Sequence, residues 1–98
     1  MITAIVFIQS EVSQISEAAT AIADIDGVSE VYSVTGDHDL IAMVRVRTHD
    51  QIASVVADRI NKVDGVLATT TQIAFRAYSS HDLEDAFSIG LDWRRLSA

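Results

Sequence analysis

Asp26-Gly27-Val28 returns 38 residues later in the chain as Asp64-Gly65-Val66, and the sequence around the two triplets repeats with them. Five further positions are identical at the same offset: Ala4/Ala42, Val6/Val44, Ser16/Ser54, Ala19/Ala57 and Ile22/Ile60. Self-similarity at one fixed offset is typical of a repeated supersecondary unit. The sequence therefore predicts two successive copies of one unit.

Each copy has the pattern of a strand, a helix and a second strand. Residues 2–8 and 39–46 are short runs rich in Ile and Val without Gly or Pro, which is typical of buried strands. Apolar residues at helical spacing follow each run. Residues 28–35 and 66–76 contain many β-branched side chains and are expected to form the closing strands. The predicted order of elements is βαββαβ.

Small residues mark the expected ends of both helices. The hydroxyl groups of Ser10 and Thr48 are expected to cap the helix N-termini. Gly27 and Gly65 are expected to end the helices, since glycine readily adopts the left-handed conformation found at helix C-termini.

The order βαββαβ predicts an α+β fold of the ferredoxin-like class, with a four-stranded antiparallel sheet and both helices on one face. The other face is also expected to be apolar, and it carries Ile5, Phe7, Ile41 and Met43. Leu67, Ile73 and Phe75 are expected to join one of the two faces. Because an uncovered aliphatic face marks an interface, the sequence predicts a homodimer packed sheet to sheet, a dimeric α+β barrel.

This predicted domain takes up residues 1–78 and leaves residues 79–98 as a C-terminal tail. Residues 82–89 have helical character, and three apolar side chains follow them: Leu91, Trp93 and Leu96. We expect a partly helical tail that packs on the oligomer.

Composition limits the classes of function. The chain has 98 residues, of which 49% are hydrophobic, enough for one folded domain. A net charge of −7 disfavours direct binding to nucleic acid or to an anionic membrane. There is no cysteine, and no apolar run approaches the length of a membrane helix. A cytoplasmic, soluble domain is expected.

The segment between the two middle strands is the first candidate site. It reads Thr35-Gly36-Asp37-His38-Asp39 and is too polar to serve the core. Its glycine permits close approach of a ligand, its carboxylates can accept hydrogen bonds from an ammonium group, and its free backbone N–H groups can bind a carboxylate. The alternative is a hairpin turn in which Asp39 bonds to neighbouring backbone amides.

Three consecutive threonines, Thr69, Thr70 and Thr71, are the second candidate site. Their hydroxyls alternate between the two faces of the last strand and are either ligand contacts or simply residues of high β-propensity. Catalytic and metal-binding patterns are absent from the sequence: no histidine pair has ligand spacing, and no nucleophile motif or phosphate-binding glycine loop occurs. No cofactor, metal or enzymatic activity is expected.

The turn, the Gly-Val pairs and the threonines together resemble the effector-binding (RAM) domain of the Lrp/AsnC family of transcriptional regulators. The resemblance covers residues 1–78 and rests on the run Asp26-Gly27-Val28, Val31, Val34-Thr35-Gly36-Asp37-His38-Asp39-Leu40, Val44, Ile60, Asp64-Gly65-Val66, Thr69-Thr70-Thr71 and Ile73. It implies an amino-acid sensor whose dimers associate into octameric rings. The effector is then expected at subunit interfaces, in contact with the turn residues and with threonines of the last strand.

Two departures from the family pattern stand out. His38 occupies a position where the family more often has an aromatic residue, and the chain begins at the first strand, without the family's helix-turn-helix domain. The resemblance therefore implies a stand-alone domain that does not contact DNA itself. Such a domain either modulates full-length Lrp/AsnC regulators through mixed oligomers or simply binds and buffers the effector.

Two other classes of protein fit the predicted architecture. One is a small cofactor-free enzyme of the dimeric α+β-barrel type, similar to a monooxygenase, with a polar cavity between helices and sheet that includes Tyr32, His38, Tyr78 or Trp93. The other is an oligomerisation module without a ligand.

Overall fold

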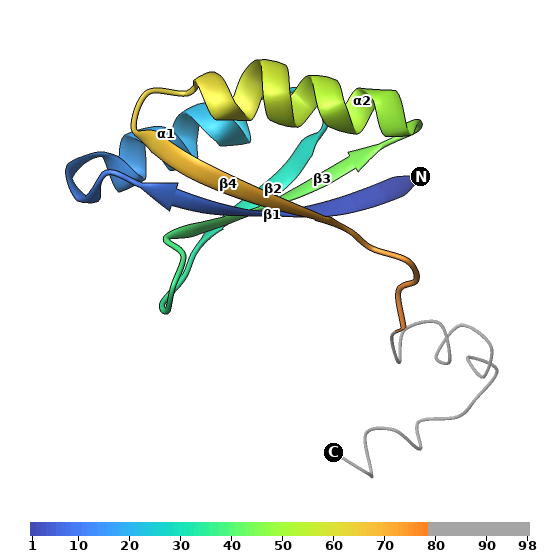
Figure 1. Cartoon of the computed structure of the whole chain (residues 1–98), viewed down its shortest axis with the longest axis horizontal. Helices are drawn as coiled ribbons and strands as arrows, with labels where there is room; N and C mark the ends of the chain where they lie inside the picture. Colours follow the sequence, from blue (N-terminus) through green and yellow to red (C-terminus); the bar gives the residue numbers. More distant parts are fainter. Residues whose placement is uncertain (79–98) are drawn as a thin grey trace, which may run out of the picture.

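Four antiparallel strands form one sheet, and both helical segments cover the same face of it (Figure 1). The structure, a computed structural model, describes residues 1–78. The strands and main helices are β1 (Ile2–Ser10), α1 (Ile15–Ala23), β2 (Val28–Ser33), β3 (Leu40–Val46), α2 (His49–Ala53) and β4 (Val66–Ile73). A 3₁₀ turn, η1 (Val12–Gln14), precedes α1, and α2 continues through the π-helical segment η2 (Ser54–Arg59) and the 3₁₀ turn η3 (Ile60–Lys62). The predicted ferredoxin-like order βαββαβ is confirmed.

The strand order is β2-β3-β1-β4, so the two strands that begin the repeat units, β1 and β3, pair at the centre. Their register joins Ile8 to Leu40, Val6 to Ala42 and Ala4 to Val44. These pairs lie on one face, because side chains alternate along a strand.

The helix-facing side of the sheet forms the core. Alternate residues of the central strands are buried there, and so are the apolar stripes of the helical segments. The buried apolar residues are Ala4, Val6, Ile8, Ala18, Ile22, Ile25, Leu40, Ala42, Val44, Val46, Ile52, Val55, Val56 and Ile60. Packing of aliphatic side chains between two layers therefore holds the helices on the sheet.

The opposite side of the sheet, here called the open face, carries the intervening residues Ile5, Phe7, Ile41 and Met43, each half-buried. Its apolar character is as predicted. Of the three residues expected to join a face, Ile73 pairs with Ala4 on the helix-facing side, and Phe75 follows the strand and lies beside Ile5 and Met43 of the open face. Leu67 is the extra residue of a bulge opposite Gln9 and Ser10.

Only one of the two predicted hydroxyl caps is present. Thr48 caps α2 in a capping box, in which its hydroxyl accepts from the Gln51 N–H and the Gln51 side chain returns to the Thr48 N–H. Ser10 is instead the buried last residue of β1, paired with Val66, and α1 begins only at Ile15. Pairing with β4 extends β1 to Ser10, an effect that local sequence does not reveal.

Gly27 and Gly65 have the predicted positive φ, 97° and 93°, but they do not end the helices. Each is the third residue of a four-residue turn. In the first turn the Val28 N–H donates to the Ile25 carbonyl at 3.1 Å, and in the second the Val66 N–H donates to the Val63 carbonyl at 3.1 Å. A positive φ at the third residue is typical of a type II turn, and glycine is favoured there. The glycines therefore start the closing strands.

Replacing Gly27 by alanine is expected to destabilise the fold more than replacing Gly36 by alanine. Both glycines have positive φ, 97° and 106°, so both changes add backbone strain of about 1–2 kcal/mol. At Gly27 the added Cβ also lies 3.0 Å from a Val55 methyl group and 3.1 Å from a Val46 methyl group, whereas nothing lies within 4 Å at Gly36. Urea unfolding of both variants measures the difference, and equal losses would contradict the packing argument.

Candidate functional site

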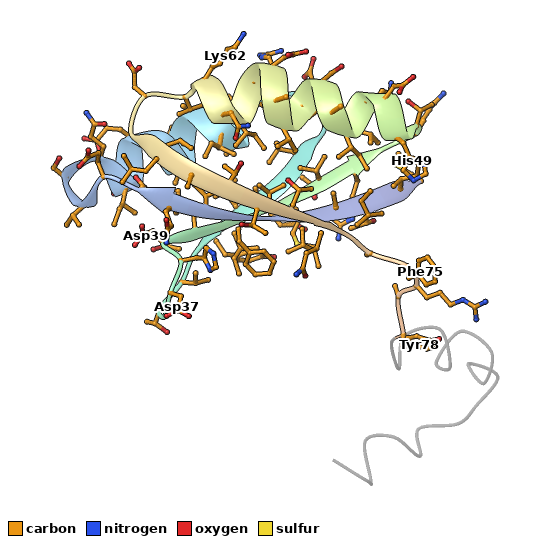
Figure 2. The ribbon with its side chains drawn as sticks, in the orientation of Figure 1. Asp37, Asp39, His49, Lys62, Phe75 and Tyr78 are labelled. Carbon is orange, nitrogen blue, oxygen red and sulfur yellow. The ribbon has the colours of Figure 1, made fainter. Side chains whose placement is uncertain are left out.

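The turn between β2 and β3 lies at one end of the sheet, where Figure 2 shows Asp37 and Asp39. Two backbone hydrogen bonds hold its base. The Val34 N–H donates to the Asp39 carbonyl at 3.0 Å, and the Asp39 N–H donates to the Ile8 carbonyl of β1 at 2.9 Å. The turn is therefore fixed to the central strand as well as to its own hairpin.

Asp39 strengthens this attachment through its side chain. Its Oδ2 accepts a 2.8 Å hydrogen bond from the backbone N–H of Ser10, a residue that is only 4% exposed. A hydrogen bond from a buried amide to a carboxylate is stronger than a neutral one. The sequence left open a simple hairpin turn in which Asp39 bonds to neighbouring backbone amides. Asp39 does bond to a backbone amide, but that amide belongs to β1 and not to the turn.

The tip of the turn is open. Thr35, Gly36 and Asp37 are exposed, and within residues 1–78 no carbonyl accepts from the N–H groups of residues 35–38. The Asp37 carboxylate likewise accepts no hydrogen bond from the described residues, although its carbonyl accepts one from the Gln9 side chain at 3.3 Å. The tip therefore presents several backbone donors beside one carboxylate.

His38 connects the turn with the open face. Its ring is half-buried and lies 5.2 Å, centroid to centroid, from the ring of Phe7, at an interplanar angle of 48°. This tilted arrangement is favourable for two aromatic rings. A change in the position of His38 would thus alter both the turn and the apolar face beside it.

The three threonines do not form one group. Thr69 and Thr71 pair with Ile8 and Val6 and so share the helix-facing side, where the Thr69 hydroxyl lies 2.6 Å from Oδ1 of Asn61. Thr70 pairs with Phe7 and shares the open face with it. Of the three, only Thr70 lies on the same face as the Phe7–His38 pair.

Sequence reasoning missed the residues of β1 that support the turn. Phe7, Gln9 and Ser10 each contact it, from about thirty positions away in the chain. The repeat offset already aligns β1 with β3, but it does not state that the two strands pair with each other. These contacts therefore follow only from the observed pairing of β1 with β3, which brings the end of β1 next to the turn.

The described residues do not assemble the cavity that an enzyme of the barrel type requires. Ser10 is the one buried polar residue within residues 1–78, and the space between helices and sheet holds aliphatic side chains. Tyr32 lies on the open face and Tyr78 beyond β4, while Trp93 is outside the described residues. No group of three or more acidic or histidine side chains within residues 1–78 is arranged to hold a metal ion.

One ion pair lies on the open face at the opposite end of the sheet from the turn. The Arg45 guanidinium is 2.7 Å from a carboxylate oxygen of Glu30 and also donates to the Ser29 hydroxyl. The hydrogen bond from Arg45 lowers the pKa of the Glu30 carboxyl. Both side chains are exposed, so the pair contributes little to stability.

No helix within residues 1–78 has the length and apolar character needed to cross a membrane.

Solved structures share this fold. A protein from Thermus thermophilus matches 81% of this chain and 99% of its own, with 43% sequence identity and a TM-score of 0.76. The feast or famine regulatory protein from M. tuberculosis, solved in complex with L-methionine, matches 82% of this chain and 54% of its own, with 25% identity and a TM-score of 0.69.

Sequence comparison leads to the same group of proteins. An uncharacterised HTH-type transcriptional regulator of Pyrococcus horikoshii is 39% identical over 59 residues, which make up 60% of this chain and 39% of the regulator. The chain thus corresponds to about two fifths of that relative, and the relatives are regulators of transcription. The model of the Lrp/AsnC ligand binding domain matches residues 3–83, more than half of the chain. This protein belongs to the Lrp/AsnC ligand-binding domain family and has the ferredoxin-like fold.

Proposed function

We propose that this domain senses a free α-amino acid, which binds at the tip of the β2–β3 turn where copies of the chain meet. One observation carries the proposal: the turn is anchored at its base by Asp39 and left open at its tip, beside the apolar open face. A rigid polar group next to an apolar surface is the usual arrangement of a small-molecule site.

The chemistry of the tip suits a zwitterion. The N–H groups of residues 35–38 can donate to the ligand carboxylate, and the Asp37 carboxylate can accept from its ammonium group. Gly36 has φ of 106° and no side chain in the way, so the backbone is accessible there. His38 and Thr70 are then the side chains that meet the variable part of the ligand.

The amino-acid class is supported by a relative of the same family. The M. tuberculosis feast or famine protein has been solved with L-methionine, an amino acid with an apolar side chain. In this chain the Phe7–His38 pair and the neighbouring apolar face supply a comparable surface for such a side chain.

We infer further that the open face is covered by a second copy of the chain, giving the sheet-to-sheet homodimer. The half-buried Phe7 and Ile41 and the exposed Tyr32 on this face are too apolar to remain in water as one patch. By analogy with the family, dimers would associate into rings, including mixed rings with full-length regulators. A ligand changes such assembly only by binding one assembly better than another.

One observation favours the oligomerisation module as the second candidate. The Asp39 carboxylate, an expected ligand contact, already accepts a hydrogen bond from the Ser10 N–H. If the whole turn served only to join strands, the domain would assemble without an effector.

A thermal-shift screen of the purified chain against the twenty amino acids tests the sensor. A ligand at one hundred times its Kd is expected to stabilise the folded state by about 2.7 kcal/mol. Asp37→Ala should abolish the shift, because it removes the free acceptor for the ammonium group, and Asp58→Ala, the same change on an exposed helical position, should preserve it. Absence of any shift would favour the ligand-free module.

Asp39 and Asp37 are expected to differ in their effect on stability. Asp39→Ala leaves the buried Ser10 N–H without a partner and should lower the free energy of unfolding by about 1–3 kcal/mol. Asp37→Ala removes an exposed carboxylate and should change it by less than about 0.5 kcal/mol. Urea unfolding distinguishes the two, and a similar cost for both would contradict the assignment of Asp39 as the anchor.

Ile41→Glu is expected to convert the homodimer into a monomer, since it places a charge on the apolar open face, opposite Phe7. Thr20→Glu, on the exposed surface of α1, is the matched control and should leave the mass unchanged. Light scattering coupled to size exclusion measures the mass. A monomeric parent chain would contradict the proposed dimer directly.

A further inference from the structure

The pairing of β1 with β4 changes register at the end of the sheet that carries the turn. The last pair in the main register is Gln9 with Ala68. Ser10 then pairs with Val66, which leaves Leu67 as the extra residue of a β-bulge. A bulge bends its strand and re-aims a side chain, and bulges are frequent next to functional sites. The bulge at Leu67 is therefore a candidate for a movable element beside the turn.

The bulge and the turn meet at one residue. Ser10, where the register changes, is also the residue whose N–H donates to the Asp39 carboxylate. The Ile8 carbonyl accepts from the Asp39 N–H and so lies on the β3 side of β1, and backbone groups two residues apart share a side. Because β3 begins only at Leu40, the Asp39 carboxylate supplies the acceptor that one more strand residue would have supplied. The Asp39 bond thus holds the point at which the strand pairing changes.

A second register is available to the same two strands. If the main register continued to the end of β1, Leu67 would lie opposite Ser10 and Val66 opposite Glu11. In this straight register Leu67 would share the helix-facing side with Ser10, and Val66 would turn to the open face. In the observed, bulged register Leu67 is 62% exposed and Val66 packs against the core. The two registers thus exchange one aliphatic side chain for another in the core.

The change of register has space and keeps its hydrogen bond. A hollow of about 400 Å³ is lined by residues of the connection between β1 and α1 and of the start of β4, among them Gln14 and Asp64. In the bulged register the Glu11 N–H donates to the Gly65 carbonyl at 2.8 Å. In the straight register the same N–H would face the Val66 carbonyl, so this bond of the ladder is replaced and not lost.

We propose that Asp39 couples the turn to this bulge as a two-state switch. While the Asp39 carboxylate holds the Ser10 N–H, the bulged register is favoured and Leu67 lies exposed. Release of the carboxylate favours the straight register, in which Leu67 enters the core and Val66 leaves it. The bond acts on the bulge because it is made at the residue where the register changes.

The trigger of this switch rests on the proposed amino-acid site. A ligand ammonium group at the tip attracts the Asp39 carboxylate as well as that of Asp37, and so competes with the Ser10 N–H for it. A ligand shifts an equilibrium between two states by as much as its affinity for them differs. Because Leu67 leaves the surface in the straight register, the apolar surface at this end of the sheet changes with the ligand.

Thiol labelling of the folded protein tests the switch without a ligand, because the chain has no cysteine of its own. The single thiol of the Leu67→Cys variant is exposed in the bulged register and enters the core in the straight one. A hydrogen bond to a charged group is worth about a factor of ten in an equilibrium constant. Adding Asp39→Ala should therefore slow the labelling severalfold, and adding Asp37→Ala, the same change at the open tip, should not.

The direction of the change separates a switch from a loss of structure. Fraying of β1 and β4 would speed the labelling of Leu67→Cys in the Asp39→Ala background, whereas the switch slows it. Asp39→Asn keeps an acceptor for Ser10 but loses the charge, so its labelling rate should be intermediate, and it replaces Asp39→Ala if that variant folds poorly. Faster labelling, or equal effects of Asp39→Ala and Asp37→Ala, would overturn the proposal.

Disulfide trapping identifies the register directly. The Glu11 N–H points to β4, so Ser10 lies in a non-hydrogen-bonded pair, where the two Cα atoms are close enough for a disulfide. Ser10→Cys with Val66→Cys should trap the bulged register, and Ser10→Cys with Leu67→Cys should trap the straight one. Asp39→Ala should raise the yield of the second pair severalfold relative to the first.

The same two cysteine pairs test the trigger. Each of the twenty amino acids is added, and one that gives a thermal shift should also raise the yield of the pair that traps the straight register. An amino acid that shifts the melting temperature but leaves both yields unchanged would overturn the switch and leave the sensor intact. If no amino acid gives a shift, the sensor fails, and the Asp39→Ala results still decide the coupling between turn and bulge.

Discussion

The antiparallel pairing of β1 with β3 is the interaction on which the rest of this structure depends. Its register sets Ile8 against Leu40, and every second residue on both strands then faces the helices. A shift by one residue would move this aliphatic set to the open face. The same register brings the end of β1 to the β2–β3 turn, where the Ser10 amide meets the Asp39 carboxylate. Core and candidate site thus follow from one pairing.

The two ends of the sheet have opposite character. At the turn end, Asp37 is exposed beside free backbone donors, and the His38 ring contacts Phe7. At the other end, Arg45 and Arg76 line an apolar groove. The backbone donors and the carboxylate of the first surface suit the zwitterion proposed above as its ligand. The open face reaches both ends, and it is the surface that we propose a second copy covers.

Local sequence signals succeeded where the deciding contacts are local. The Thr48 cap depends on Gln51, three residues away, and the helical stripes depend on spacing within one segment. The same signals were misleading where pairing with a strand far away in the sequence determines the local structure. Serine is a common N-cap residue, yet pairing with Val66 keeps Ser10 in β1. The turns at Gly27 and Gly65 precede strands and do not end helices, because the chain must return to the sheet there. The threonines looked like one group, but the pleat of β4 separates Thr70 from its neighbours.

The sequence by itself determined the order of elements, the apolar composition of both sheet faces and the family, because a 38-residue repeat and alternating aliphatic residues are properties of neighbouring positions. It also indicated the turn as the place where polar groups gather. Tertiary structure alone decided which of these groups are already engaged. Asp39 is bonded to β1 and Thr69 lies against Asn61, whereas Asp37 remains open. The physical reason is that hydrogen bonds between strands join residues far apart in the chain, and their partners are defined only once the register exists.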